Sequence, residues 1–307
     1  TSTELRNLLA DADTGLVIGS DLDAVATAEW SVQLPDILIH ATLNPDDIGF
    51  GYETTVGIVA DACQFLLAVD RCLSDDSVTT AEKETTEGQT RSGQARAQAV
   101  RTADADRFAA LTADAPESAP LRSVEVLEVI RNSLPPETIV TADAGGFRLW
   151  TLVSFPAAGP TSYVNPGSWA TMGSGLPSAI GAKIANPEQD VVALSGDGGL
   201  MMCVHELHTL ATEAIDLTVV VLNNDDYAII SEEAERSYGF PDGAYGWATT
   251  TLDFVSIATG MGITAERAHS REEVADALAA AKAHNGPALV EVLTDPMEPQ
   301  ASQWMRK

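Results

Sequence analysis

The sequence predicts an α/β protein with a mostly parallel sheet, and two observations support that prediction. From residue 121 onward, short apolar runs alternate with helical segments, as in βα units whose sheet is covered by helices on both faces. The stretch 191–227 shows the pattern most clearly. One apolar run ends in Ser-Gly-Asp-Gly-Gly, a helical stretch follows, and a second run ends in Asn-Asn-Asp-Asp. The two runs flank a single crossover, so we expect parallel neighbouring strands.

Residues 1–75 predict a smaller, partial α/β domain. Residues 4–10 have the pattern of the end of a helix, and apolar spacing predicts another helix at 60–73. Three strands are few for a complete doubly wound domain, so we expect only part of one. The three predicted strands are 15–19, 37–41 and 55–59.

Residues 76–120 have the composition of a polar linker, because Ser, Thr, Ala, Gln, Asp and Glu dominate them. Within this stretch, the Ala-rich spacing of residues 94–111 is compatible with a helix, and its arginines are expected to form a solvated face.

Residues 121–307 predict the main domain. Its first helix is expected to start at Ser123 as N-cap and to end near Asn132, ahead of two prolines. A second glycine-rich strand end follows at 143–146. The predicted strands are 137–142, 191–194, 217–222, 263–265 and 288–293. The other predicted helices are 147–152, 175–185, 252–259 and 271–283.

The charge balance narrows the class of partner. Lys and Arg total 17 and Asp and Glu total 45, which gives a net charge of −28. Such a charge argues against nucleic acid and anionic membranes as partners. Hydrophobic residues make up 45% of the chain, too many for a disordered acidic protein. The acids are scattered along the chain, so we interpret them as salt adaptation of a halophilic, cytoplasmic protein.

Three cysteines show neither paired nor metal-binding spacing, which favours a reduced intracellular protein. No apolar run approaches transmembrane length, and no signal peptide is visible.

Polar residues at the ends of the two central strands predict a binding site. Asp197 and the amide oxygen of Asn224 are hard oxygen ligands, which we expect to meet at the carboxyl edge of the sheet. Magnesium prefers such ligands, often together with phosphate oxygens. The glycines around Asp197 leave backbone N–H groups bare at a helix start, which suits an anionic phosphate. The residues therefore predict a magnesium-bridged diphosphate site.

This arrangement resembles the thiamine diphosphate motif, in which GDG is followed at a distance by NN; here 24 residues, 199–222, intervene. Three further segments are similar to acetolactate synthases: TADAGGFRLW to TDVGQHQMW, WATMGSGLPSAIGA to GTMGFGLPAAIGA, and LDFVSIATGMG to PDFVKLAEAFG. Residues 121–307 therefore resemble the diphosphate-binding domain of the acetolactate synthase, benzoylformate decarboxylase and pyruvate decarboxylase superfamily. Residues 1–75, with IHATLNPDDIG, resemble the second half of its middle domain.

The resemblance implies thiamine diphosphate and magnesium as cofactors and assigns residues to them. Magnesium is held by Asp197, Asn224 and the carbonyl of Asp226. Met172 is the catalytic wedge whose side chain bends the cofactor, so that its amino group reaches the thiazolium carbon. The implied cofactor-binding residues are Ala144, Gly145, Gly146, Phe147, Ala170, Thr171, Met172, Gly196, Gly198, Gly199, Asn224, Asp226 and Tyr227.

The resemblance implies a 2-oxo acid carboligase or lyase, nearest to acetolactate synthase. Two departures keep alternatives open. Gly146 and Phe147 replace a Gln and a His of the family motif, which weakens the case for acetolactate synthase itself. Ile230 stands where pyruvate decarboxylases have a Glu, which suits a carboligase or a benzoylformate-type decarboxylase. A non-catalytic, cofactor-binding remnant is the third reading.

The resemblance also implies a partner. The family's catalytic Glu lies in a pyrimidine-binding domain that no segment here matches, so we expect that domain from the same gene or from another subunit. Because the chain starts at Thr1, a fragment of a longer enzyme is the favoured expectation. A homodimer or homotetramer acting on a small 2-oxo acid is expected.

Two other motifs are weaker. His205, Glu206 and His208 form H-E-x-H, one residue short of a zinc motif, and we interpret them as packing or solvated residues. Tyr245 and Trp247 either line a substrate entrance or anchor a surface loop.

Overall fold

The computed structural model describes residues 3–24, 26–74, 80–113, 120–241, 245–247 and 250–301. The chain forms two compact units, Thr1–Ala109 and Ala110–Trp304, each with its own sheet. Within the described ranges, every helix is too short or too polar to cross a membrane.

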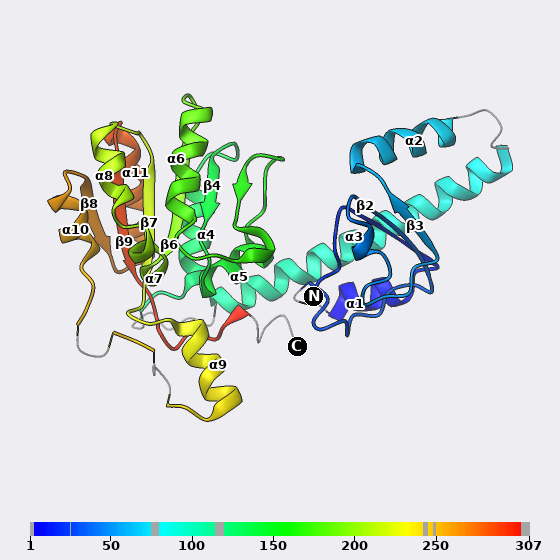
Figure 1. The fold of residues 1–307 in the computed structure, drawn as a ribbon, viewed down its shortest axis with the longest axis horizontal. Coiled ribbons are helices and arrows are strands. Elements are labelled where there is room, and N and C mark those ends of the chain that lie inside the picture. The colour runs from blue at the N-terminus through cyan, green and yellow to red at the C-terminus, as the bar shows by residue number, and fades with distance from the viewer. Residues whose placement is uncertain are drawn as a thin grey trace. The chain divides into compact units, whose positions relative to one another are not determined.

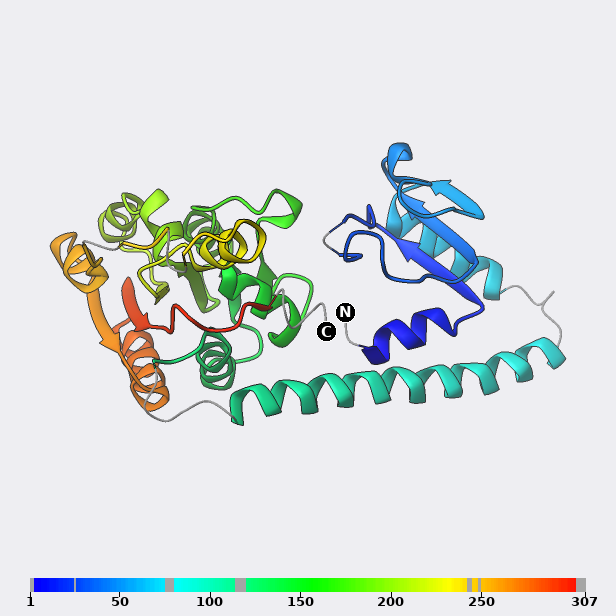
Figure 2. The same cartoon turned by 90° about the horizontal axis from the view of Figure 1, so that it is seen from below.

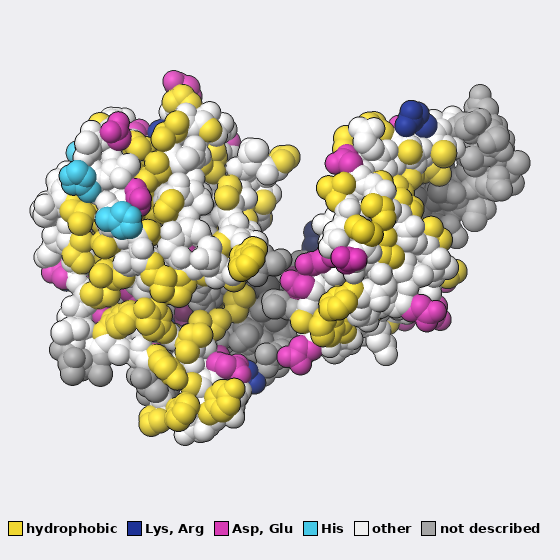
Figure 3. Space-filling model, in the orientation of Figure 1, with side chains coloured by type: hydrophobic (Ala, Val, Ile, Leu, Met, Phe, Trp, Pro, Cys, Tyr) yellow, Lys and Arg dark blue, Asp and Glu magenta, His cyan; other side chains and the backbone are white. Residues whose placement is uncertain are grey.

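The first unit is built on a three-stranded parallel sheet in the order β1-β2-β3, as predicted. Its central strand buries Leu38 and Ala41, whereas Leu16 and Val59 on the outer strands are exposed. Figure 3 shows hydrophobic side chains on the visible face of this unit. The elements are α1 (Thr3–Ala10), β1 (Thr14–Ile18), β2 (Ile37–Thr42), the 3-10 turn η1 (Pro45–Asp47), β3 (Val56–Val59) and α2 (Ala62–Ser74).

Helix α3 (Thr80–Ala113) occupies most of the segment expected to be a linker. The helix predicted at 94–111 is therefore present, but it belongs to a single helix of 34 residues, seen at full length in Figure 2. A linker role for 76–120 stays a prediction.

The second unit contains a six-stranded, fully parallel sheet in the order β5-β4-β6-β7-β9-β8 (Figure 1). This confirms the predicted fold class. The strands are β4 (Ile139–Ala142), β5 (Tyr163–Val164), β6 (Val191–Gly196), β7 (Thr218–Asn223), β8 (Thr264–Ala268) and β9 (Ala288–Leu293). The helices are α4 (Ser123–Ser133), α5 (Gly146–Ser154), α6 (Gly175–Ala185), α7 (Asp197–Met202), α8 (Glu206–Thr212), α9 (Ala228–Tyr238), α10 (Phe254–Gly260) and α11 (Arg271–His284), with a 3-10 turn η2 (Gly167–Trp169).

Both faces of this sheet are covered, which explains why its central strands are continuous apolar runs rather than alternating ones. Alternate residues of β6 and β7, such as Ala193 and Val221, pack with Leu176, Leu207 and Phe254 from α6, α8 and α10. Helix α11 packs on β8 and β9 and also contacts α4, which contacts α5.

The start of α4 differs from the prediction. Ser123 is the first helical residue, not the N-cap, and Glu125 accepts the N–H of Arg122 at 3.0 Å. Ser123 donates its own N–H and hydroxyl to the buried carboxylate of Glu298, 175 residues away. This long-range partner takes over the hydroxyl that was predicted to cap the helix. The helical stretch after Asp197 is divided into α7 and α8, and α9 and β5 were not predicted.

Candidate functional site

The site lies at the switch point of the sheet, between β4 and β6, where the connections between strands begin to run in opposite directions. From β4 the chain crosses to β5 at one edge, whereas from β6 it crosses to β7 on the other side. Adjacent strands whose connections diverge in this way leave a crevice at their carboxyl ends, where ligands bind in open α/β sheets. Asp143 follows β4 and Asp197 follows β6, so both acids lie at this crevice.

Asp143 is the anchor of the crevice. Its fully buried carboxylate accepts the backbone N–H groups of Ala144 (2.8 Å), Gly173 (3.0 Å) and Ser174 (3.2 Å), and the hydroxyl of Ser195 (3.0 Å). One side chain thereby joins the loop after β4, the loop that carries Met172, and the end of β6. A single acid in a glycine-rich turn gives no sign of these partners, so the role of Asp143 was not predictable from the sequence.

Asp197 presents a buried carboxylate whose hydrogen-bond partners among the described residues are all neutral. It accepts the N–H of Gly198 at 2.6 Å and the indole N–H of Trp247 at 3.3 Å, and the backbone N–H of Asn224 also bonds to it. The pKa of Asp197 is raised to about 6, mainly by desolvation and also by the neighbouring charge of Asp225, whereas these hydrogen bonds lower it. A buried carboxylate without a cationic side chain is a natural ligand for a metal cation.

The loop after β7 brings amide and carbonyl oxygens beside Asp197. Gly196 pairs with Leu222 in the sheet, so the residues that follow each strand emerge together. Asn224 is half-buried, and its Oδ1 accepts the N–H of Asp226 at 3.2 Å. The carboxylate of Asp226 accepts the Ser231 hydroxyl at 2.8 Å, so this side chain is already engaged within the protein. A metal role for the Asp226 carbonyl stays a prediction.

The oxygen ligands predicted here fit magnesium better than zinc. Among the residues that the structure describes, no three His, Cys, Asp or Glu side chains come together to hold a metal. One carboxylate, one amide oxygen and one carbonyl form an incomplete oxygen set, as expected when phosphate oxygens and water fill the other positions of magnesium. The set therefore suits a cation that arrives with a diphosphate.

Trp247 and Tyr227 form an aromatic wall beside Asp197. Their rings meet edge to face with centroids 4.7 Å apart. A Cβ on Gly198 would lie 2.2 Å from the ring of Tyr227, so only glycine fits under this ring. Trp247 lies at the crevice through its bond to Asp197. The sequence offered Trp247 as part of a substrate entrance or as a loop anchor, but it gave no sign of this bond. Tyr245 is exposed, and its N–H donates to the Ser231 hydroxyl at 3.2 Å.

The predicted phosphate loop turns from β4 into α5. Ala144 and Phe147 are buried, and the glycines between them are half-buried. Gly146 faces Gln300, whose Oε1 would be 2.3 Å from a Cβ at that position. This Oε1 is buried and has no hydrogen-bond partner in the described part of the protein. A polar atom left unpaired beside the loop is a further sign that a polar ligand belongs there.

The remaining predicted residues lie in the loop between η2 and α6. Ala170 adopts a left-handed conformation with φ 47°, and Ala170 and Thr171 are exposed. Met172 is half-buried and precedes Gly173, whose N–H bonds to Asp143. The loop that carries the predicted wedge is therefore attached directly to the anchor of the crevice.

The H-E-x-H residues lie outside the crevice at the surface. His205 is exposed and lies 3.3 Å from the carboxylate of Glu206, and His208 lies 3.3 Å from the hydroxyl of Thr212 in α8.

Comparison with known proteins finds one family model that matches part of the second unit. Residues 143–292 match the model of the "Thiamine pyrophosphate enzyme, C-terminal TPP binding domain". This match begins at Asp143 and includes the loop after β7 that contributes Asn224 and Asp226.

Three similar proteins are acetolactate synthase large subunits. The "Probable acetolactate synthase large subunit" of Methanococcus aeolicus is 29% identical over 268 residues, which are 84% of this chain and 43% of that protein. The isozyme 1 large subunit of Escherichia coli is 30% identical over 181 residues, 58% of this chain and 32% of that protein. The large subunit of Parasynechococcus marenigrum is 27% identical over 285 residues, 92% and 44% respectively. The chain thus spans less than half the length of these relatives.

Proposed function

Since residues 143–292 of this chain are a C-terminal TPP binding domain of the thiamine pyrophosphate enzymes, distantly homologous to acetolactate synthase large subunits, we propose that the chain is the cofactor-binding part of an enzyme dependent on thiamine diphosphate and magnesium. The proposed substrate is a small 2-oxo acid, and the proposed reaction is a carboligation or lysis of the acetolactate synthase type.

The observation that carries the proposal is the buried Asp197 beside Asn224 at the switch point of the sheet. Asp197, Asn224 and the Asp226 carbonyl would hold the magnesium ion that neutralises the diphosphate. In the first turn of α5, the N–H groups of Gly146 and Phe147 have no partner within the helix, and the N-cap Gly145 provides no side-chain cap, which favours an anion. Asp143 connects the loop before α5 to the end of β6 through its bonds to Ala144 and Ser195, and so fixes the phosphate loop relative to Asp197.

When bound, thiamine diphosphate supplies an electron sink for cleaving the bond next to a 2-oxo group. The residues of this chain bind and orient it. Met172 would support the bent conformation of the cofactor, on a loop held by Asp143. Trp247 and Tyr227 exclude water from one side of Asp197 and its ligand.

A benzoylformate-type decarboxylase is the second candidate. Phe147 is buried at the phosphate loop, and Ile230 is an exposed aliphatic side chain on α9 three residues beyond Tyr227. Apolar side chains at these two positions favour a larger, less polar substrate than pyruvate. We expect no turnover from this chain alone, so the assay that distinguishes the two candidates adds a pyrimidine-binding partner and compares pyruvate, 2-oxobutyrate and benzoylformate.

The proposed partner is a pyrimidine-binding domain, from the same gene or from another subunit, within a homodimer or homotetramer. Three segments near the site carry exposed apolar side chains: Trp169 of η2 at 92% exposed, Met202 of α7 and Ile230 of α9. Exposed apolar residues around a site are expected where a partner covers it. The partner would contribute the catalytic Glu that the resemblance places there.

The metal assignment is tested by replacing Asp197. Asp197→Ala removes the one carboxylate of the proposed ligand set, so we expect magnesium-dependent binding of thiamine diphosphate to be lost while the fold remains. Isothermal titration calorimetry measures binding, and circular dichroism measures the fold.

The matched control is Asp190→Ala. Asp190 precedes β6 at the opposite end of the same strand and pairs with Lys282 at 2.7 Å. Its replacement should leave binding intact. Unchanged binding by the Asp197→Ala protein would overturn the proposed function.

A further inference from the structure

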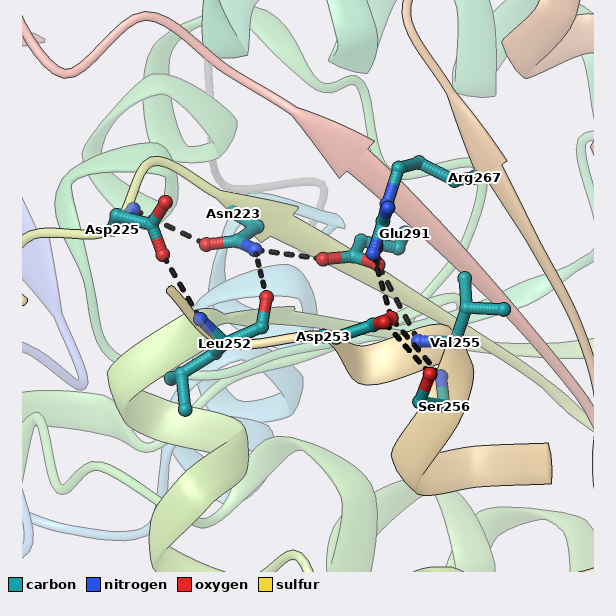
Figure 4. A network of polar contacts seen from close by, with 8 residues as sticks. All are labelled: Asn223, Asp225, Leu252, Asp253, Val255, Ser256, Arg267 and Glu291. Carbon is teal, nitrogen blue, oxygen red and sulfur yellow. Dashed lines mark hydrogen bonds and ion pairs between the residues drawn. The ribbon is translucent and has the colours of Figure 1, made fainter. Parts of the chain in front are cut away.

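The first asparagine of the Asn-Asn pair is fully engaged inside the protein. Asn223 is buried at the end of β7, and its Oδ1 accepts the N–H of Asp225 at 3.1 Å. Its Nδ2 donates to the carboxylate of Glu291 at 2.7 Å and to the carbonyl of Leu252 at 3.2 Å. Both amide protons are therefore used within the protein, and the side chain points toward Glu291 and Leu252 (Figure 4).

Glu291 is a buried charge in the middle of β9, where a strand of this sheet is otherwise apolar. Its exposure is 0%, and Arg267 of β8 pairs with it at 2.9 Å. Arg267 also bonds to Asp253, whose carboxylate caps α10 by accepting the N–H of Ser256 at 3.0 Å. A buried carboxylate persists only when a cation and hydrogen bonds compensate it. At Glu291, Arg267 supplies the positive charge and Asn223 donates a hydrogen bond to the other oxygen.

The network reaches the loop of the proposed metal ligands at two points. The Asn223 side chain sets the turn at Asp225, a non-glycine residue with φ 54°. Asp225 in turn accepts the N–H of Leu252 at 3.3 Å through its carboxylate and the N–H of Trp247 at 2.8 Å through its carbonyl. The left-handed residue between Asn224 and Asp226 is therefore held from both sides.

A left-handed conformation at a non-glycine residue is strained and persists only where the surroundings impose it. Here the surroundings are Asn223, Leu252 and Trp247, and Trp247 is also bonded to Asp197. The network consequently connects β8 and β9 with the loop from Asn224 to Asp226 and, through Trp247, with Asp197.

We propose that Asn223 and Glu291, neutralised by Arg267, are positioning residues that preform the metal-binding loop from Asn224 to Asp226. They do not ligate the ion, but they fix the backbone from which the Asn224 amide and the Asp226 carbonyl project. The inference rests on the proposed function for the identity of the ligand. Outer-shell partners of this kind typically change metal affinity about 10–100-fold when they are replaced.

The test compares two substitutions at Glu291. Glu291→Leu removes the acceptor for Asn223 and the partner of Arg267. Glu291→Gln retains an acceptor for Asn223, but it removes the charge and the second oxygen, which accepts from Arg267 and from the N–H of Val255. We expect the dissociation constant for magnesium, titrated as MgCl2 at saturating thiamine diphosphate, to rise about 10–100-fold in the Leu variant and less in the Gln variant.

A second readout needs no cofactor. Hydrogen exchange of the protein without added metal should be faster in Glu291→Leu at the amides of Asp225, Trp247 and Leu252, and unchanged in α11. The matched control is Arg271→Gln, which breaks the ion pair of Arg271 with Glu128 between α11 and α4. It should leave both exchange at the loop and magnesium binding as in the unmodified chain.

The outcomes separate the two claims. If the unmodified chain binds no magnesium and thiamine diphosphate, the proposed function fails, and the positioning role fails with it. If it binds them and both Glu291 variants bind equally well, the positioning role alone is overturned. Faster exchange throughout α11 in both variants would show that Glu291 only stabilises the whole unit, and this would also overturn the proposal.

Discussion

Gly175 and Gly181 lie on the same helix but in opposite surroundings. A Cβ at Gly175 would lie 2.9 Å from Asp143 Cβ, 3.0 Å from the Asp143 nitrogen and 3.0 Å from the Leu194 carbonyl. Backbone atoms of two central strands cannot move aside, so Gly175→Ala should destabilise the protein by about 1–3 kcal/mol. Urea unfolding measures the change in the free energy of unfolding.

Gly181 provides the control for this prediction. Nothing lies within 4 Å of a Cβ at Gly181, in the middle of α6. Gly181→Ala should therefore stabilise the protein by about 0.5–1 kcal/mol, through helix propensity alone. Equal effects of the two substitutions would contradict close packing of α6 against Asp143.

At the scale of residues, the sequence predicted the parts of the site that follow from local order. Asp197 and Asn224 follow apolar strands directly, and the structure brings them together. The supporting residues were not predictable, because their partners are distant in sequence. Trp247 is 50 residues from Asp197, and Glu291 is 68 residues from Asn223. Only the folded sheet makes such pairs neighbours.

The segment after β9 is an element held by one buried acid. Glu298 is 6% exposed and accepts the N–H of Ser123 at 2.7 Å, which attaches the segment to the start of α4. Desolvation raises the pKa of Glu298 from 4.5 to about 7, although the bonds from Ser123 lower it. The folded protein therefore holds this proton more tightly than the unfolded chain does.

The pH dependence follows from that difference. Between about pH 4.5 and 7 the folded state binds more protons at Glu298, so this contribution to stability is full below pH 4.5 and is lost as pH rises through 7. The loss is on the order of 3 kcal/mol above pH 7. Glu298→Gln, which mimics the protonated acid, should flatten the fall in unfolding free energy between pH 5 and 8.

Ser123→Ala is the complementary variant. It removes a hydroxyl donor to the ionised form of Glu298, so the loss of stability should extend to higher pH. Chemical unfolding at several pH values measures both variants. Parallel curves for the unmodified chain and Glu298→Gln would show that this acid does not titrate in the window.

At the scale of elements, long apolar strands and small-residue helices were predicted well, as β9 and α6 show. Helix α9 was missed for a physical reason. Its buried side chains are Ala228, Ser231 and Ala234, which lie three residues apart but are small and partly polar. They form a packing face without the apolar periodicity that identifies an amphipathic helix.

The excess of acidic residues concerns the whole molecule. With 45 acids against 17 bases, the net charge is −28. Surface ion pairs such as Lys282 with Asp190 contribute at most about 1 kcal/mol each, and salt weakens them. Repulsion among the unbalanced acids opposes compactness, and salt relieves it. We therefore expect the melting temperature to rise from low to molar KCl, by about 2–4 °C for each kcal/mol relieved.

A local pair of acids separates charge screening from a general effect of solutes. Glu272 and Asp276 are exposed one turn apart on α11, where like charges repel by about 0.2–0.5 kcal/mol. The variant Asp276→Asn should melt higher than the unmodified chain at low KCl, because it removes the repulsion and keeps Glu272, whose charge is favourable in the first turn of α11. In molar KCl the screening length is about 3 Å, shorter than the roughly 5–6 Å between the two positions, so the difference should vanish. Sucrose, which carries no charge, should stabilise both proteins and leave the difference between them unchanged. A difference that persists in molar KCl, or a melting temperature that does not rise with KCl, would contradict the interpretation of the acids as salt adaptation.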